Sequence, residues 1–440
     1  MTIDTEINRI LVVGSWAKEQ ITIENIRKRN NVKIFAYMNI KNPAIISLVD
    51  GYKIGRLSNK KQIVDYAKKQ KVDLALVTTA KPLSLGVVDA LEKENILVFG
   101  PNKKAAKLEN DKAFTRKLMQ KYRINNALPE FKVFNDRNRA INYAENLDWK
   151  VAVKPIGLTE GLGVKIFGDQ LKNKDDVINY IDMIFKNKIG GDSKVLIEEK
   201  LMGEEFTIQC FVYKKHIIAT PAVKDFKRLL PGDKGPNTAS MGSYSDNNFL
   251  LPFMKKEDYI NAVNIIMKTL HAFYVETNGY CKGFFYGQFM KTKDGLKLIE
   301  YNFRPGDPEW MNIMLIMDDN LIDVIKYLMD EVQKPVKFED KATVCKYVVP
   351  EGYPRVLNQV LDVRFNAKKI NNLGVNIYYS SGIDNKGKLR IGCERGIAFV
   401  SKEDSISKAN EQVEKAISMV QGNFHYRQDI GTEEMIKLAL

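Results

Sequence analysis

Short apolar runs alternate with longer mixed stretches through the first hundred residues. Runs of buried type occupy residues 10–14, 33–38, 74–79 and 96–101, and the segments between them carry apolar positions at helical spacing. Strands that alternate with helices in this way are typical of a parallel sheet. The pattern therefore predicts an α/β domain over residues 1–100, with ligands expected at the carboxyl ends of its strands.

After residue 101 the pattern changes to helices followed by strands of antiparallel type. The apolar or alternating runs lie at residues 151–155, 194–201, 206–212, 284–290 and 296–302. A Lys-Asp-Gly turn at 293–295 separates the last two runs and indicates a hairpin. We predict a central region over residues 101–335 and a small α/β unit over residues 336–440. The predicted fold class is multidomain, α/β and α+β.

The second strand of this hairpin ends in a turn rich in polar side chains. Residues two apart on a strand point to the same face, so Glu300 and Asn302 project together and Arg304 follows them. The hairpin brings Gln288 close to this pair. Two oxygen ligands beside a guanidinium suit Mg²⁺ holding a polyphosphate. A solvated strand end with capping side chains is the alternative.

A lysine followed by glycines marks a second candidate site. Lys154 closes an apolar strand, and Gly157, Gly161 and Gly163 follow it. Glycines let backbone N–H groups approach phosphate oxygens, and a lysine adds positive charge. The segment is therefore a candidate phosphate loop, with a flexible turn as the alternative. Lys112 lies on a predicted helix, where a lysine is usually a surface residue, and it is a further candidate for the same ligand.

Two other polar connectors are candidate ligand contacts. Residues 198–201 run from a strand into a turn, and Glu205 opens the next strand. Backbone amides at such a connector can contact a base, and a carboxylate can accept from ribose hydroxyls. Residues 232–242 form a long loop of small and polar residues, with the cations Lys227 and Arg228 upstream. Such loops often bind ligands or act as lids, and a charged exposed loop is the alternative.

Composition and charge narrow the possible chemistry. Apolar residues make up 45% of the 440 residues, which indicates packed domains rather than disorder. The net charge is 68 − 54 = +14, but lysines are scattered among acids and no nucleic-acid module is present, so no nucleic-acid partner is expected. Four cysteines far apart and only three histidines argue against a zinc site, a disulfide framework and Ser-His-Asp chemistry.

The sequence also lacks the patterns of membrane and secreted proteins. No apolar run approaches the length that crosses a bilayer, and the polar first six residues do not resemble a signal peptide. We therefore expect no membrane partner and a cytoplasmic location. No sequence feature specifies an oligomeric state.

The order of these motifs carries a family resemblance. A strand ending in Lys and a glycine loop, then Glu-Glu-Lys-Leu with Gly-Glu-Glu-Phe, Gly-Pro-Asn-Thr, and Glu-x-Asn-x-Arg-x-Gly-Asp-Pro-Glu resembles the ATP-grasp ligases. Over nearly its whole length the chain is similar to the archaeal phosphoribosylamine–glycine ligases. The resemblance implies a Rossmann-like pre-ATP-grasp domain, an ATP-grasp domain with a mobile lid at about 122–190, and a small C-terminal domain.

The resemblance further implies a ligase of purine biosynthesis. ATP would phosphorylate the carboxylate of glycine, and the amine of 5-phosphoribosylamine would attack the glycyl phosphate to give glycinamide ribonucleotide. Mg²⁺ or Mn²⁺ would assist, and glycine and 5-phosphoribosylamine are the implied small-molecule partners.

The resemblance assigns roles to individual residues. Those implied to hold the nucleotide are Lys112, Lys154, Gly157, Gly161, Gly163, Glu198, Glu199, Lys200, Leu201 and Glu205. Glu300 and Asn302, together with Gln288, would bind the metal, and Arg304 and Lys154 would be catalytic. Those implied on the substrate side are Asp225, Lys227, Arg228, Asn237, Thr238 and Asp307.

Several motifs depart from the family pattern. Ala-Arg-Glu-His reads Ala-Lys-Glu-Gln at 17–20, Gly-Pro-Glu reads Thr-Thr-Ala at 78–80, and the lysine of Gly-Gly-Lys-Gly is replaced by Leu162 beside Glu160. Three interpretations stay open: a working phosphoribosylamine–glycine ligase, a ligase of the same mechanism with another acid or amine, and a catalytically weak nucleotide-binding relative. We favour the first because Glu300, Asn302, Arg304, Lys154 and Lys112 are all present.

Overall fold

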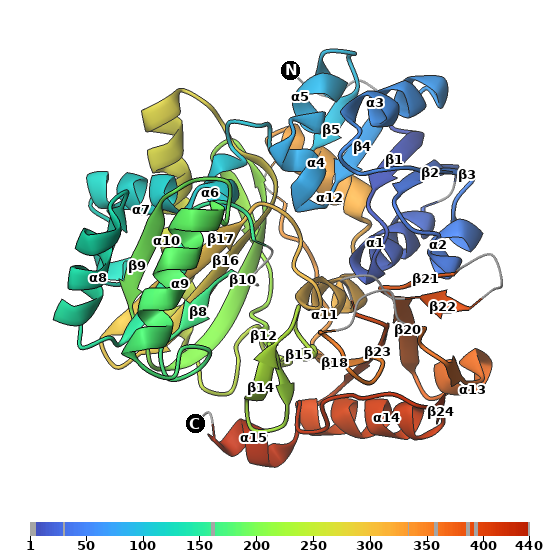
Figure 1. The fold of residues 1–440 in the computed structure, drawn as a ribbon. Coiled ribbons are helices and arrows are strands. Elements are labelled where there is room, and N and C mark those ends of the chain that lie inside the picture. Colours follow the sequence, from blue (N-terminus) through green and yellow to red (C-terminus); the bar gives the residue numbers. More distant parts are fainter. Residues whose placement is uncertain are drawn as a thin grey trace.

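A parallel sheet of five strands forms the first lobe of the protein (Figure 1). The computed structural model describes residues 6–29, 31–159, 163–332, 334–355, 360–383, 388–390 and 395–438. The strands, in the order β3-β2-β1-β4-β5, are β1 (Arg9–Val13), β2 (Lys33–Met38), β3 (Gly51–Ile54), β4 (Leu74–Val77) and β5 (Leu97–Phe99). The helices of this lobe are α1 (Ala17–Arg27), α2 (Pro43–Leu48), α3 (Lys60–Lys69), α4 (Ala80–Ser84) and α5 (Val87–Glu92). The predicted parallel α/β architecture is confirmed.

The sequence pattern did not predict β3, which lies at the edge of this sheet. Its side chains alternate between partly buried and exposed, and Tyr52 and Ile54 are 43% and 44% exposed. An edge strand buries less of its surface than a central one and carries no continuous apolar run.

Two four-stranded antiparallel sheets form the second lobe. One has the order β6-β9-β7-β8, with β6 (Phe131–Phe134), β9 (Val195–Glu199), β7 (Val151–Pro155) and β8 (Lys165–Ile166). The other has the order β11-β10-β16-β17, with β11 (His216–Ala219), β10 (Glu204–Tyr213), β16 (Lys282–Thr292) and β17 (Gly295–Asn302). The helices of this lobe are α6 (Lys107–Asn110), α7 (Lys112–Lys121), the 3₁₀ turn η1 (Asn125–Ala127), α8 (Arg137–Asn146), α9 (Lys174–Asn187) and α10 (Lys256–Thr277).

The third lobe contains a sheet assembled from distant parts of the chain. Its order is β12-β15-β18-β23-β20, with β12 (Lys224–Asp225), β15 (Gly242–Ser245), β18 (Ala342–Val348), β23 (Ile397–Glu403) and β20 (Val375–Tyr379). Helices α11 (Glu309–Ile316) and α14 (Ile406–Ser418) pack on it. Two of its strands therefore precede residue 335, and the division of the chain at residues 100 and 335 stays a prediction.

Smaller elements complete the chain. They are the strand pairs β13 (Arg228–Leu230) with β14 (Lys234–Asn237), β19 (Val363–Arg364) with β24 (Gln421–Gly422), and β21 (Gly382–Ile383) with β22 (Leu389–Arg390), and the helices α12 (Leu321–Met329), α13 (Ala367–Asn371) and α15 (Glu433–Leu438).

The largest hydrophobic core joins all three lobes. Trp310 of α11 lies at its centre, with ring centroids 5.7 Å from Phe211 and 5.0 Å from Phe284. Its indole N–H donates to the hydroxyl of Thr22 on α1 at 2.9 Å. A continuous core of this kind holds the lobes in one arrangement. The β6-β9-β7-β8 sheet packs instead with α8 and α9 over a separate core, and the mobility of this part of the chain stays a prediction.

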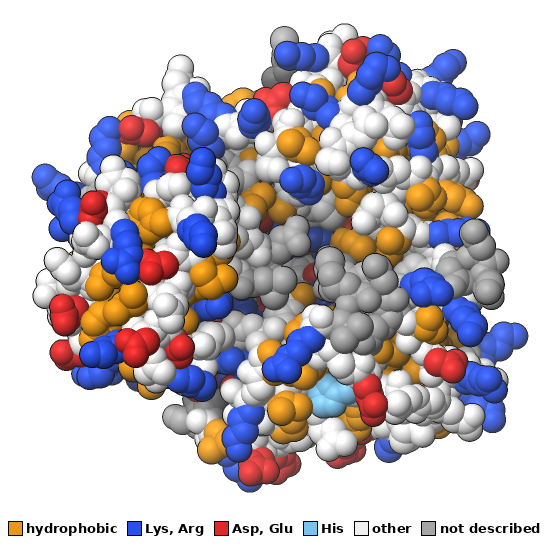
Figure 2. All heavy atoms as spheres, viewed as in Figure 1, with side chains coloured by type: hydrophobic (Ala, Val, Ile, Leu, Met, Phe, Trp, Pro, Cys, Tyr) orange, Lys and Arg blue, Asp and Glu red, His pale blue; other side chains and the backbone are white. Residues whose placement is uncertain are grey.

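Charged side chains are spread over the surface. Figure 2 shows Lys and Arg side chains across the whole visible face, with acidic side chains among them. Within the described ranges, no helix has both the length and the apolar character required to span a membrane.

Candidate functional site

A cavity of about 1290 Å³ lies where the lobes meet. The carboxyl ends of β1, β2 and β4 contribute to its wall, as do β7, β10, β16 and β17. The sequence-predicted residues on its lining are Lys112, Lys154, Glu205, Asp225, Lys227, Arg228, Asn237, Thr238, Gln288, Glu300, Asn302, Arg304 and Asp307. Those that do not line it are Gly157, Gly163, Glu198, Glu199, Lys200 and Leu201. Gly161, with Glu160 and Leu162, lies outside the described residues.

The end of β17 presents its polar side chains as an array. The Asn302 amide donates to Glu300 Oε1 at 3.2 Å, and Arg304 donates to Asn302 Oδ1 at 3.3 Å. The predicted hairpin register is confirmed, because Gln288 on β16 is paired opposite Glu300. Burial opposes ionisation of the Glu300 carboxyl, but Lys112, Lys227 and Lys154 hold its pKa below the usual value. The array therefore carries an ionised carboxylate beside an amide oxygen.

A bulge in β17 directs a backbone carbonyl toward two cations. The register shifts between Gln288 and Phe289, which leaves Ile299 outside the regular pairing. The Ile299 carbonyl accepts from Arg116 at 2.8 Å and from Lys154 Nζ at 3.3 Å. The bulge thus helps to fix the position of Lys154 on the cavity wall.

Glu198 holds the same two cations from the opposite side. Its carboxylate accepts from Arg116 Nε and pairs with Lys154 Nζ, both at 2.6 Å, and the side chain is 2% exposed. Burial opposes ionisation, yet Arg116 and Lys154 together keep the pKa of Glu198 below its usual value. The resemblance implied an adenosine contact for this carboxylate, and that role stays a prediction. In the structure the carboxylate pairs with Arg116 and Lys154.

Lys112 approaches the same end of the cavity from α7. Its ammonium group donates to the Gly157 carbonyl at 3.3 Å. Burial lowers its pKa, and the Glu300 carboxylate opposes this shift. The residue is half-buried rather than a surface lysine, so two lysines and an arginine converge around Glu300 and Asn302. This arrangement can neutralise a polyphosphate and present oxygen ligands to a cation.

Glu205 and Lys227 form the neighbouring part of the wall. Glu205 Oε2 accepts from Lys227 Nζ at 2.8 Å and from the Gln288 amide at 2.7 Å. Acidic neighbours outweigh burial and raise the pKa of Lys227, so this lysine stays charged. The Thr238 hydroxyl donates to the Lys227 carbonyl at 2.9 Å and supports the connection between β12 and β13 that carries Lys227.

Asp307, Arg228 and Asn237 lie farther along the cavity wall. Asp307 pairs with Arg395 at 2.5 Å and accepts from the Tyr347 hydroxyl at 2.6 Å. Arg228 pairs with Asp169 at 2.6 Å and is opposite Asn237 in the β13–β14 ladder. Within the described ranges, no group of three or more His, Cys, Asp or Glu side chains is arranged to hold a metal ion.

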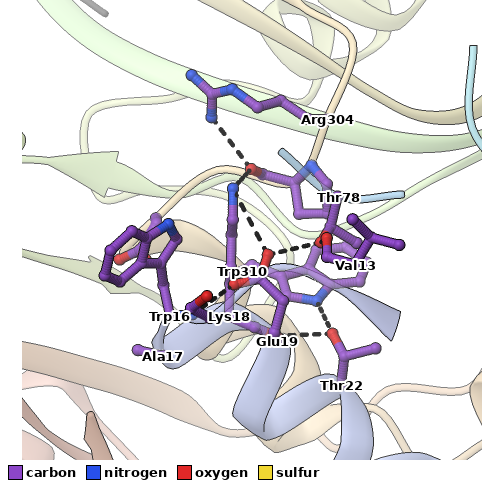
Figure 3. A network of polar contacts seen from close by, with 12 residues as sticks. Val13, Trp16, Ala17, Lys18, Glu19, Thr22, Thr78, Arg304 and Trp310 are labelled. Carbon is purple, nitrogen blue, oxygen red and sulfur yellow. Dashed lines mark hydrogen bonds and ion pairs between the residues drawn. The ribbon is translucent and has the colours of Figure 1, made fainter. Parts of the chain in front are cut away.

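The first lobe reaches Arg304 through a shared carbonyl (Figure 3). Lys18 Nζ donates to the Pro305 carbonyl at 3.4 Å, and Arg304 donates to the same oxygen at 3.2 Å. Beside Lys18, the buried Glu19 carboxylate accepts from the Trp16 N–H at 2.7 Å and from the Thr78 hydroxyl at 2.6 Å. Burial raises the pKa of Glu19 to about 7.

Sequence reasoning missed several residues that shape this site. Arg116 lies four residues after Lys112, so its helical spacing placed both on one face of α7. Glu309 was visible in the turn after β17, but no pattern assigned it a role. Lys18 appeared only as a departure from a family motif. Tyr286 gave no signal, because tertiary contacts between distant elements bring it to the cavity.

Two antiparallel sheets line one cavity with lysines, a carboxylate–amide pair and an arginine, and a parallel α/β lobe lies beside them. These features define an ATP-grasp protein. A model of the phosphoribosylglycinamide synthetase N domain matches residues 8–109, and a model of its ATP-grasp (A) domain matches residues 110–310. The phosphoribosylamine–glycine ligase of Methanosphaera stadtmanae is 43% identical over 431 residues, 97% of each chain. That of Methanopyrus kandleri is 42% identical over 436 residues, 98% of this chain and 97% of its own. The chain belongs to the phosphoribosylamine–glycine ligase (phosphoribosylglycinamide synthetase) family.

Solved structures show the same fold at lower sequence identity. Phosphoribosylamine–glycine ligase from Thermotoga maritima superposes with a TM-score of 0.78 at 23% identity, covering 96% of this chain and all of that one. The biotin carboxylase domain of Hydrogenobacter thermophilus 2-oxoglutarate carboxylase, solved with MgADP, ADP and bicarbonate, gives 0.72 at 14% identity, with 96% and 92% coverage.

Removing the Glu198 carboxylate should destabilise the protein strongly. Glu198→Ala leaves Arg116 and Lys154 as buried cations without their shared partner, which is expected to cost about 3–5 kcal/mol. Urea unfolding followed by tryptophan fluorescence measures this loss. The control is Glu276→Ala, which removes a surface pair with Lys121 and should change stability little. Equal stability of the two variants would contradict the structural role of Glu198.

Glu19→Gln should stabilise the protein at high pH. The folded pKa of Glu19 is about 7, against 4.5 as the ordinary value. The folded state therefore retains a proton that the unfolded chain releases, and stability falls as pH rises from about 4.5 to about 7, by about 3 kcal/mol. A glutamine carries no charge, and its amide can donate to Thr78 Oγ1, whose hydroxyl can donate to the Val13 carbonyl.

Thermal and urea unfolding of the variant and the parent at pH 5 and pH 8 provide the measurement. The variant should gain stability relative to the parent at pH 8 and match it at pH 5. A difference that does not change with pH would contradict the raised pKa.

Proposed function

We propose that this protein joins glycine to 5-phosphoribosylamine in an ATP-dependent reaction that gives glycinamide ribonucleotide, ADP and phosphate. The family supports this proposal, since relatives named phosphoribosylamine–glycine ligase match the chain over 97% of their length. The observation that carries it is the array of Glu300, Asn302 and Arg304, with Lys112 and Lys154 beside it at one end of the cavity.

The residues of this array fit ATP and a divalent cation. Lys112 and Lys154 supply positive charge for phosphate oxygens, and the ionised Glu300 with Asn302 offers hard oxygen ligands. Mg²⁺ or Mn²⁺ bound there would neutralise charge that develops on the phosphates during transfer. Lys227, held beside Glu205, provides a further cation at this wall and can offset the loss of the lysine that the family has at position 162.

The chain's residues act by positioning and by charge. A glycine carboxylate oxygen attacks the terminal phosphorus of ATP, and Arg304 steadies the transferring group from its place beside Asn302. The amine nitrogen then attacks the acyl carbon of glycyl phosphate, and phosphate leaves. Phosphoryl transfer of this kind needs no protein nucleophile, and the described residues on the cavity lining include neither His nor Cys.

The remaining site residues are proposed as follows. The connector 199–201 and Glu205 contact adenosine, and Gly157 and Gly163 let the backbone approach the phosphates. Glu198 acts through Lys154. The residues proposed to face glycine and the phosphoribosyl group are Asp225, Lys227, Arg228, Asn237, Thr238 and Asp307. A cytoplasmic location is proposed because ATP and a phosphorylated sugar amine do not cross membranes unaided.

Substrate omission tests the proposal directly. ADP release is measured with Mg²⁺, ATP, glycine and 5-phosphoribosylamine generated in the cuvette, and each component is then left out in turn. We expect release to need all of them and glycinamide ribonucleotide to form. ATP binding without such turnover would contradict the proposed substrate pair and point to another acid or amine, or to a role in binding alone.

Glu300→Gln tests the metal assignment in the same assay. The variant keeps the shape of the side chain but loses its charge, so turnover should fall by at least about 100-fold. Circular dichroism and the melting temperature should match those of the parent protein. Unchanged turnover would contradict the role of Glu300.

A further inference from the structure

Forming an amide from an amine requires an acceptor for one proton. The attacking nitrogen still carries this proton when its bond to the acyl carbon forms. It must lose the proton to give a neutral amide. An acceptor works best when its pKa lies near the working pH and it faces the reacting groups. The described cavity lining holds no histidine, so a carboxylate is the natural candidate.

Most carboxylates on the described cavity lining are already engaged by cations. The ion pairs are Glu109 with Arg304, Asp169 with Arg228, Glu204 with Lys224, Glu205 with Lys227, Asp233 with Arg427 and Asp307 with Arg395. Glu300 is kept ionised by three lysines. A carboxylate oxygen that contacts a cation is less accessible to a proton of the substrate than one without such a contact. Asp225 and Glu309 are the remaining carboxylates on the described cavity lining.

Asp225 is buried on β12 with an oxygen that lacks a partner. The residue is 8% exposed, and among the described residues its Oδ1 has no hydrogen-bond partner. Burial raises its pKa, Lys227 opposes that shift, and Glu205 adds to it. An unpaired buried carboxylate oxygen on a cavity wall is costly, and a proton would satisfy it.

Glu309 begins α11 and is 3% exposed. The Tyr286 hydroxyl donates to its Oε1 at 2.9 Å, and a Cβ at position 306 would lie 2.6 Å from its Oε2, so Gly306 leaves room for this oxygen in its present position. Burial and, after it, the Asp225 carboxylate raise the pKa of Glu309 to about 7. Two carboxylates that interact in this way favour a single shared proton.

We propose that Asp225 and Glu309 act as a carboxyl pair that accepts the proton lost by the amine nitrogen during amide formation. The nitrogen lone pair forms the bond to the acyl carbon, and the bond from that carbon to the phosphate oxygen breaks, with its electrons leaving on phosphate. The N–H proton moves to the ionised member of the pair and returns to solvent when products leave. This inference rests on the proposed ligase function.

The surroundings of the pair set its pH response. The titratable and charged groups that face it are Asp307 and Arg304 on the turn before α11, Tyr286 on β16, Cys345 on β18, and Lys227, Glu205 and Glu300 around Asp225. Asp307 and Arg304 carry their own ion-pair partners, so the pair is expected to control the pH dependence near neutrality.

Glu309→Gln separates proton acceptance from earlier steps. The first measurement is glycinamide ribonucleotide formation from pH 6 to pH 9. The second replaces 5-phosphoribosylamine with hydroxylamine, which traps glycyl phosphate as the hydroxamate and reports the first step alone. We expect ribonucleotide formation by the variant to fall by at least about 100-fold. We also expect the variant to lack the rise in rate near pH 7. Its hydroxamate formation should stay within about threefold of the parent. Asp225→Asn should also lose the rise in the rate of ribonucleotide formation near pH 7.

Asp233→Asn is the matched control, because Asp233 also lines the cavity but is paired with Arg427. This variant should keep the parental pH profile. Loss of both activities with a raised KM for glycine would overturn the proposal and indicate that the pair binds the glycine ammonium group instead. Unchanged ribonucleotide formation in Glu309→Gln would also overturn it. A parent protein that forms hydroxamate but no ribonucleotide would refute the substrate pair itself.

Discussion

The buried carboxylate of Glu198 is the interaction on which the geometry of the site depends. It lies between Arg116 and Lys154, and the Ile299 carbonyl completes the set of partners. These groups come from β9, α7, β7 and the bulge of β17, so one ion cluster fixes two antiparallel sheets and a helix relative to each other. Buried ions persist only when their partners are correctly placed. The position of Lys154 therefore depends on how several elements pack together and not on β7 alone.

The carboxylates on the cavity wall differ in electrostatic character. Three lysines hold the pKa of Glu300 below its usual value, whereas burial raises the pKa of Asp225 and Glu309 above theirs. A polyphosphate and an amine make opposite demands on their surroundings, and the wall supplies both within one enclosure. The overall charge of +14 says nothing of this contrast. What matters is whether nearby cations outweigh the burial of each carboxylate.

Sequence patterns predicted the parts of the structure that depend mainly on residues close together in the chain. The alternation of strands and helices predicted the parallel sheet, and the Asp-Gly turn predicted the hairpin that brings Gln288 close to Glu300. The ion pairs of Glu198 were not predictable, because its partners come from other elements and only tertiary packing brings them together. The same holds for β15, which pairs with the distant strand β18, and for Asp307, whose partner is Arg395.

The assembly of the third sheet has a consequence for how the protein is made. β15 pairs with β18, which the ribosome delivers roughly a hundred residues later, and β23 follows later still. Pairings between distant segments form slowly because a long loop must close first. Asp225 lies on β12 at the edge of that sheet. The nascent chain can complete its parallel first lobe early, but this wall of the cavity exists only after almost the whole polypeptide has been synthesised.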